Sequence, residues 1–168
     1  KMLARQGHFA QSDEVVSLIQ TQLAAVGINV EVDLMEKSAW MTETIHKRLA
    51  YLQGENVTMN YHMGLDAWVS DTLFAGDDLY SLYTTTTDHN WCFYDNPEVD
   101  QLIRFSVSMA PYEERVEAAL KAQEIMMQDV AMIPLFVQEF LEASSPKYKG
   151  HIILPNCYDY FLEAYFEE

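Results

Sequence analysis

The residues that could do chemistry gather in one short stretch, Gly64-Leu65-Asp66-Ala67-Trp68-Val69-Ser70-Asp71, which continues to Gly76-Asp77-Asp78. A carboxylate accepts short charge-assisted hydrogen bonds from a ligand's ammonium group, and an indole ring can cover an apolar or cationic group. The stretch therefore predicts a ligand-binding loop whose candidate residues are Trp68, Asp71, Asp66 and Asp77. The competing interpretation is structural: the aspartates cap helices or lie in solvated turns, and the tryptophan is an ordinary core aromatic.

Other chemistries lack their sequence motifs. The nucleophile-elbow pattern Gly-x-Ser-x-Gly is absent, and the six glycines form no phosphate-binding loop. The five histidines are scattered singly, without zinc-enzyme spacing; they are His8, His46, His62, His89 and His151. We therefore expect no catalytic residues, no metal and no cofactor. Cys92 and Cys157 are expected to be separate thiols, with a mutual disulfide as the alternative.

The elements that must position the loop alternate between strand and helix. Met2-Leu3-Ala4 reads as the middle of a strand. A helix is predicted over 12–26, capped by Ser12 and ended by Gly27, because apolar residues recur there at helical spacing. Apolar and polar residues then alternate over 28–34, which predicts a strand with one buried face.

The same order continues up to the candidate loop. A second helix is predicted from a cap at Ser38 to Gly54, with a buried face made of Met41, Ile45, Leu49 and Leu52. A strand is then predicted over 57–63, and it is followed by the candidate loop. Strand, helix, strand, helix, strand predicts an α/β fold: a mostly parallel sheet flanked by helices on both faces.

The second half of the chain is predicted to be mainly helical. A short helix is expected over 77–83, and longer helices are expected to begin at Asn96-Pro97 and at Pro111. The last helix has a predicted buried face of Val116, Leu120, Gln123, Met127 and Val130. An apolar strand over 132–137 is expected to close the sheet. A linker is expected at 144–147, and the chain then ends in an aromatic-rich segment.

Length and charge narrow the function further. The 168 residues are 49% hydrophobic, enough for one domain with a sizeable core. The net charge of −16 would repel nucleic acid and anionic membrane surfaces. No run approaches the roughly 20 apolar residues of a membrane helix, and the mean hydropathy is −0.13. Because the chain starts in a strand without a leader pattern, we expect a removed signal or a fragment.

An ordered series of motifs resembles the C-terminal lobe of family 5 extracellular solute-binding proteins, the receptors of peptide and nickel ABC transporters. The likeness covers nearly the whole chain, and its sharpest piece is the helix start Asn96-Pro97-Glu98-Val99-Asp100. The other matching pieces are Val15 to Val32, Trp68-x-x-Asp71, Asn90-x-x-x-Tyr94, Glu114-Arg115, Ala122-Gln123-Glu124-Ile125-Met126 and Ile133-Pro134-Leu135.

The resemblance implies a function and a set of partners. Such a lobe is one jaw of a two-lobed trap that closes around a di- or oligopeptide and delivers it to the membrane subunits of an ABC permease. By resemblance, Asp71 anchors the peptide's amino terminus and Trp68 lines the pocket. Asp77 or Asp78 matches a Gly-Asp segment only with a displacement of about one residue. The implied location is periplasmic or extracellular, including a membrane-anchored cell-surface form.

The resemblance also divides the chain. Residues 1–143 correspond to the ligand-binding lobe, and residues 144–168 to a tail that would pack on the missing N-terminal lobe. Without that lobe, the tail's aromatic residues are expected to drive self-association. The family's usual residues are replaced at Gly54-Glu55-Asn56-Val57 and at Ala67, which would shape the pocket for another ligand.

Two alternatives remain open. The same fold could bind a non-peptide cargo, such as a metal chelate, haem or an oligosaccharide. A small α/β hydrolase-like enzyme would instead use Asp66 or Asp71 as a base together with a histidine. A histidine within hydrogen-bond reach of such an acid, inside a closed pocket, would favour the enzyme.

Overall fold

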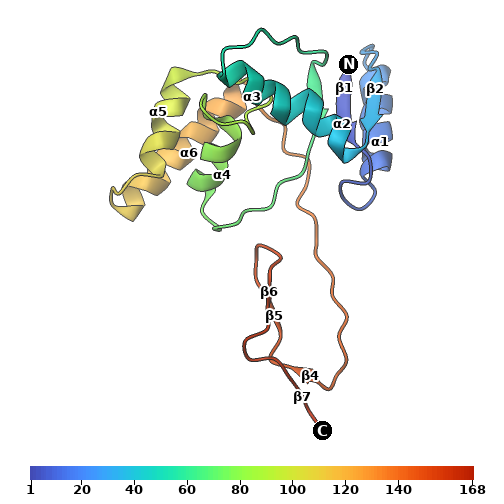
Figure 1. Cartoon of the computed structure of the whole chain (residues 1–168), viewed down its shortest axis with the longest axis vertical. Helices are drawn as coiled ribbons and strands as arrows, with labels where there is room; N and C mark the ends of the chain where they lie inside the picture. Colours follow the sequence, from blue (N-terminus) through green and yellow to red (C-terminus); the bar gives the residue numbers. More distant parts are fainter.

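The core of the fold is a parallel sheet of three strands in the order β2-β1-β3 (Figure 1). The computed structural model describes all of residues 1–168. The strands are β1 (Met2–Arg5), β2 (Val32–Met35) and β3 (Met63–Leu65). The α/β class and the order of the first five elements are confirmed. The second and third strands begin later than predicted, at residue 32 instead of 28 and at residue 63 instead of 57.

The central strand β1 is buried on both faces, and its first three residues are almost fully inaccessible. Met2 shares a core cluster with Val16 of the helix α1 (Ser12–Ala25). Leu3 points to the opposite face, because successive side chains alternate along a strand, and α2 (Lys37–Met41) contacts the strand. The sheet is therefore flanked by helices, which explains why the strand's sequence is continuously apolar.

The predicted cap of the first helix is wrong, whereas its predicted end is confirmed. The helix α1 begins at Ser12 itself, and no side chain caps it. The preceding Gln11 has a left-handed backbone with φ of 61°, so the main chain turns into the helix there. Gly27 follows the helix with φ of 85°, a conformation that favours glycine.

The second helix is one continuous rod formed by α2, the π-helical turn η1 (Thr42–His46) and α3 (Lys47–Leu52). Ser38 is not its cap, because the rod begins at Lys37 without a capping side chain. The π-helical turn changes which residues face inward along the rod. Gly54 follows the end of the rod with φ of 85°, as expected for a helix terminator.

The buried face of this rod differs from the prediction. Trp40, Thr44 and Arg48 are buried, whereas Leu49 and Leu52 are exposed. The buried guanidinium of Arg48 is satisfied by the carbonyl oxygens of residues 85 and 87, at 2.6 and 3.1 Å. Long-range pairing of this polar group therefore decides the orientation of the rod, and hydrophobic spacing alone could not reveal it.

Three helices form a second core beside the sheet: α4 (Ala75–Tyr83), α5 (Pro97–Ser106) and α6 (Tyr112–Gln128) (Figure 1). Val99, Ile103 and Met126 are almost inaccessible in this core. The predicted start of α5 is confirmed. Its first residue is a proline, and the preceding side chain, Asn96, accepts hydrogen bonds from the amides of residues 98 and 99.

The predicted buried face of α6 is wrong. Leu120 and Met127 are exposed, and the buried residues are instead Ala118, Ala119, Ala122 and Met126. The alanines allow close packing against α5, which α6 contacts more extensively than any other element. Proline at position 111 lies one residue before the helix rather than at its first position.

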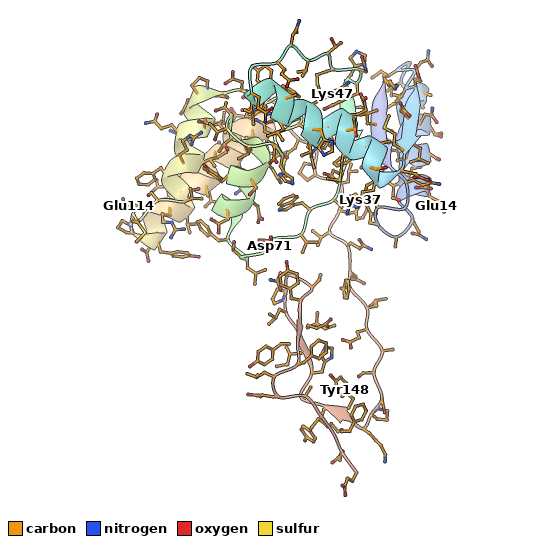
Figure 2. The ribbon with its side chains drawn as sticks, viewed as in Figure 1. Glu14, Lys37, Lys47, Asp71, Glu114 and Tyr148 are labelled. Carbon is orange, nitrogen blue, oxygen red and sulfur yellow. The ribbon has the colours of Figure 1, made fainter.

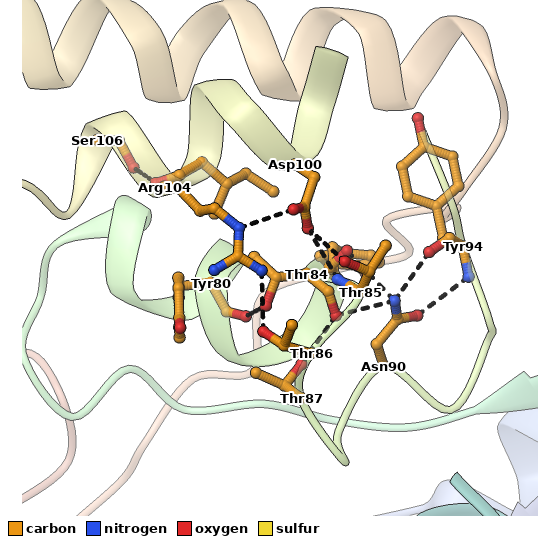
Figure 3. A network of polar contacts seen from close by, with 12 residues as sticks. Tyr80, Thr84, Thr85, Thr86, Thr87, Asn90, Tyr94, Asp100, Arg104 and Ser106 are labelled. Carbon is orange, nitrogen blue, oxygen red and sulfur yellow. Dashed lines mark hydrogen bonds and ion pairs between the residues drawn. The ribbon is translucent and has the colours of Figure 1, made fainter. Parts of the chain in front are cut away.

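A polar network joins α4, α5 and the loop between them (Figure 3). The Asn90 side chain is fully buried and donates to the carbonyl oxygens of residues 83, 84 and 94 at 2.8 to 3.3 Å. Asp100 accepts hydrogen bonds from the amide of Thr85 at 2.8 Å and from Arg104 at 2.7 Å. Burial alone would raise the pKa of Asp100, but these hydrogen bonds outweigh it and hold the pKa below its ordinary value.

The end of the chain projects away from both cores (Figure 1). The connecting segment, residues 132–143, makes no backbone hydrogen bonds. The tail, residues 144–168, contains two short antiparallel ladders. They pair β4 (Tyr148–Lys149) with β7 (Tyr165–Phe166), and β5 (Ile152–Ile153) with β6 (Asp159–Tyr160).

The predicted strand over 132–137 is therefore wrong. These residues do not join the sheet. Met132 and Phe136 contact the body of the protein at Tyr83 and Phe9, whereas Ile133 and Val137 are exposed. The expectation of separate thiols is confirmed, since Cys92 and Cys157 are both unpaired. No helix in the structure is both long and apolar enough to cross a bilayer.

We expect Asn90→Ala to lower the free energy of unfolding by about 2 to 3 kcal/mol, because it leaves buried backbone groups without partners. Chemical denaturation followed by circular dichroism measures this loss. Asn29→Ala is the matched control, since Asn29 is exposed. Equal stability of the two variants would contradict a structural role for the buried amide.

Replacing Asp100 is expected to change stability in a pH-dependent way. Its depressed pKa means that the ionised carboxylate stabilises the fold above the unfolded value of about 3.9 and that this contribution is lost as the pH falls through the folded value. Asp100→Asn should therefore melt below the wild type near about pH 7, and the difference should shrink below about pH 4. A difference in melting temperature that stays constant with pH would contradict this account.

Candidate functional site

The candidate site is the loop of residues 66–74, which connects β3 to α4. Since β1, β2 and β3 are parallel, this loop leaves the sheet at the edge where the carboxyl ends of all three strands lie. Open α/β sheets bind their ligands at that edge. The four predicted site residues are spread along this region, from the end of β3 to the first turn of α4.

Asp66 forms an internal pair with His8. The Nε2 atom of His8 lies 2.7 Å from a carboxylate oxygen of Asp66, which also accepts from the amide of Ala67 at 2.9 Å. Burial raises the pKa of this carboxyl despite the hydrogen bond from that amide. The second ring nitrogen, Nδ1, is buried without a partner. Asp66 is thus engaged within the protein.

His8 is a residue that the sequence analysis did not place at the site. It follows β1, and Asp66 follows β3, so the pairing of two neighbouring parallel strands brings the two side chains together. That adjacency is the signal that could have found it. The pair supplies the histidine and acid that the enzyme alternative requires.

The Trp68 ring lies at the surface, with 43% of the residue exposed. Its Nε1 atom donates to Asp78 at 2.9 Å, and its ring packs edge-on against His89 at a centroid distance of 5.5 Å. The ring is therefore held in place while its remaining surface is accessible. This arrangement differs from that of an ordinary core aromatic.

Asp77 makes a local contact at the start of α4. Its carboxylate accepts a hydrogen bond from the hydroxyl of Thr72 at 2.7 Å, and its amide donates to the carbonyl of Phe74 at 3.0 Å. A carboxylate in the first helical turn also suits the positive end of the helix dipole. These contacts are those of a residue that shapes the loop and the helix start.

Asp71 is exposed and makes no ion pair with a lysine or arginine. One carboxylate oxygen, Oδ1, accepts a hydrogen bond from the hydroxyl of Tyr158. The main-chain carbonyl of Asp71 accepts from the side-chain amide of Asn156 at 3.1 Å. Both partners come from the tail, which approaches this loop in Figure 2.

Two hollows lie near this region. One, of about 140 Å³, is lined by residues around β3 and by the aromatic segment 91–93. The other, of about 180 Å³, lies between residues 73–75 and α6, where Tyr112 and Leu120 line it. Neither hollow is lined by Trp68, Asp71 or the pair of His8 and Asp66. Neither therefore encloses the predicted binding residues.

The donor atoms of one further cluster, in and next to the tail, lie within metal-binding reach of one another. Glu142, His151 and Asp159 each offer one donor atom within 4.8 Å of the others. The two ring nitrogens of His151 lie 3.1 and 3.0 Å from the two different carboxylates. The ring therefore lies between the two carboxylates, with one nitrogen facing each of them.

Comparison with known proteins gives a consistent class. A scan of the chain against protein-family models finds no match. The glutathione-binding protein GsiB of Escherichia coli K12 is 27% identical over 159 residues, which cover 91% of this chain and 29% of GsiB. GsiB of Shigella flexneri matches equally. The chain thus spans less than a third of the length of these curated relatives.

Two solved structures share the fold. HbpA2 from Haemophilus parasuis superposes with a TM-score of 0.71 at 14% identity. The match covers 99% of this chain and 32% of the HbpA2 chain. The periplasmic binding protein DppA from Helicobacter pylori, in complex with the peptide STSA, superposes with a TM-score of 0.67 at 21% identity. The match covers 99% of this chain and 31% of the DppA chain. The resemblance stated from the sequence is confirmed to this extent: the chain is similar in sequence to GsiB and shares the fold of HbpA2 and DppA.

Proposed function

We propose that this chain is one lobe of a two-lobed solute-binding protein that captures di- or oligopeptides for an ABC importer. The observation that carries the proposal is Asp71, an exposed carboxylate at the ligand-binding edge of the sheet without a cationic partner. An ammonium group is the natural counterpart of such a carboxylate. Support comes from the relatives, of which one is named for glutathione and another holds a peptide.

In the proposed mechanism, Asp71 accepts hydrogen bonds from the peptide's amino terminus through its free oxygen, Oδ2. Trp68, fixed by Asp78 and His89, covers the first residue of the peptide. The second lobe closes over the ligand by hinge motion and excludes water, which strengthens the ion pair. The net charge of −16 is compatible with ammonium-bearing ligands.

We propose binding rather than catalysis as the function. The relatives GsiB and DppA are binding proteins by name. The pair of His8 and Asp66 lines neither of the two hollows described above.

The proposal also assigns the tail a partner. Residues 1–143 would form the ligand-binding lobe, and residues 144–168 would pack on a first lobe that is not part of this chain. The connecting segment supports this, because it makes no backbone hydrogen bonds and exposes Ile133, Val137 and Leu141. The further partners would be the membrane subunits of the permease, and the location periplasmic or extracellular.

We expect Asp71→Asn to weaken binding of alanine di- to pentapeptides by about 10- to 100-fold in the full-length protein, because it removes a charge-assisted hydrogen bond. Isothermal titration measures this loss, and N-acetylated peptides serve as the ligand control. Asp95→Asn is the protein control, since Asp95 is also exposed. Equal affinity of free-amine and acetylated peptides for the wild type would refute the ammonium anchor.

The isolated 168-residue chain is expected to bind the same peptides only weakly, with a Kd on the order of millimolar, or about −4 kcal/mol. Without the second lobe, the ligand remains solvated on one side and lacks half of its contacts. Titration of this chain tests the expectation directly. A submicromolar Kd would show that a single lobe suffices and would contradict the two-lobed mechanism.

A further inference from the structure

The tail contacts the candidate loop at Asp71 through two different hydrogen bonds. The hydroxyl of Tyr158 donates to the carboxylate of Asp71, and the amide of Asn156 donates to the main-chain carbonyl of Asp71 at 3.1 Å. These partners are 87 and 85 residues away in the sequence. The contact therefore joins two elements that local sequence does not hold together.

The donors sit on an ordered turn between β5 and β6. The amide of Leu154 donates to the carbonyl of Tyr158 at 2.8 Å, and the amide of Cys157 donates back to the carbonyl of Leu154 at 2.8 Å. The oxygen of the Asn156 side chain accepts from the amide of Tyr158 at 3.4 Å. Asn156 is buried although most of the tail is exposed. Both donors are thus held at fixed positions.

The loop is ordered on the other side of the contact as well. The hydroxyl of Ser70 accepts from the amide of Leu73 at 2.9 Å, and the hydroxyl of Thr72 accepts from the amide of Phe74 at 3.3 Å. Asp71 lies between these two hydroxyl residues. Its backbone and its side chain are then each fixed by a donor from the tail.

The chemistry of the two donors is informative because both are neutral. A lysine or arginine in their place would neutralise Asp71 and compete with a ligand's ammonium group. The phenol of Tyr158 engages the carboxylate and the amide of Asn156 engages the main-chain carbonyl of Asp71, and neither compensates the negative charge. The ionised Asp71 in turn raises the pKa of the Tyr158 phenol, which favours the neutral donor form.

We propose that Tyr158 and Asn156 are positioning residues that hold Asp71 in the orientation required for an ammonium group. The inference rests on the proposed function of Asp71. With Oδ1 engaged by the phenol, Oδ2 has no partner within the protein and is the oxygen offered to the ligand. The ligand then meets an ordered carboxylate and does not lose affinity by ordering it on binding.

The test compares Tyr158→Phe and Asn156→Ala with the wild type in the full-length protein, using tetraalanine and N-acetyl-tetraalanine as probes. Each variant should bind tetraalanine about 3- to 10-fold more weakly, in line with the loss of one orienting hydrogen bond. Binding of the acetylated probe should not change. Tyr165→Phe is the matched control, since it removes a tail hydroxyl that does not contact Asp71, and it should bind like the wild type.

A ligand-independent measurement tests the contact itself. The ionisation of Tyr158, followed by NMR of ¹³C-labelled tyrosine and assigned by its loss in Tyr158→Phe, should occur at a lower pH in Asp71→Asn than in the wild type. This readout does not depend on peptide binding. An unchanged titration would overturn the proposed contact.

The two kinds of failure are distinguishable. If the wild type prefers tetraalanine over its acetylated form and Tyr158→Phe keeps the same affinities, the positioning role is wrong and the ammonium anchor stands. If the wild type binds both probes equally, the ammonium anchor is wrong and the positioning role falls with it. The titration then shows whether the contact has a purely structural purpose.

Discussion

The structure depends on the parallel pairing of two short strands, β2 and β3, with the central strand β1, which is buried on both faces. This pairing places all the strand carboxyl ends at one edge. It brings His8 and Asp66 together and sends the chain from β3 directly into the candidate loop. Burial of β1 requires cover on both faces, which α1 and α2 provide. The location of the candidate loop is thus a consequence of the sheet.

Three of the carboxylates, Asp66, Asp71 and Asp100, differ in their partners. Asp66 and Asp100 are satisfied internally, by a histidine and by an arginine with a backbone amide. Asp71 has only neutral donors and remains exposed. Burying its charge next to a ligand is favourable only if the ligand brings an ammonium group and if another surface excludes water. In the proposed two-lobed protein, the first lobe would cover both the uncompensated carboxylate and the exposed tail.

The local sequence was sufficient to predict the elements that short-range patterns and capping residues determine. The alternation and helical spacing of the first 54 residues predict the strand and helix order, Gly27 and Gly54 end their helices, and Asn96 caps α5. The local sequence was insufficient where contacts between distant residues decide which face of a helix is buried. Arg48 turns its helix toward the carbonyl groups near residue 86, and the alanines of α6 pack inward. Asp71 could be selected from its loop, but no local pattern connects it with Tyr158.

The central claim is that Asp71 receives the amino terminus of a peptide. It is tested most directly by a crystal structure of the full-length protein with a bound free-amine peptide. The account predicts that the peptide nitrogen lies about 2.7 to 2.9 Å from a carboxylate oxygen of Asp71, the distance of a charge-assisted hydrogen bond. A peptide nitrogen bound elsewhere, or an Asp71 paired with a lysine or arginine of the other lobe, would contradict it.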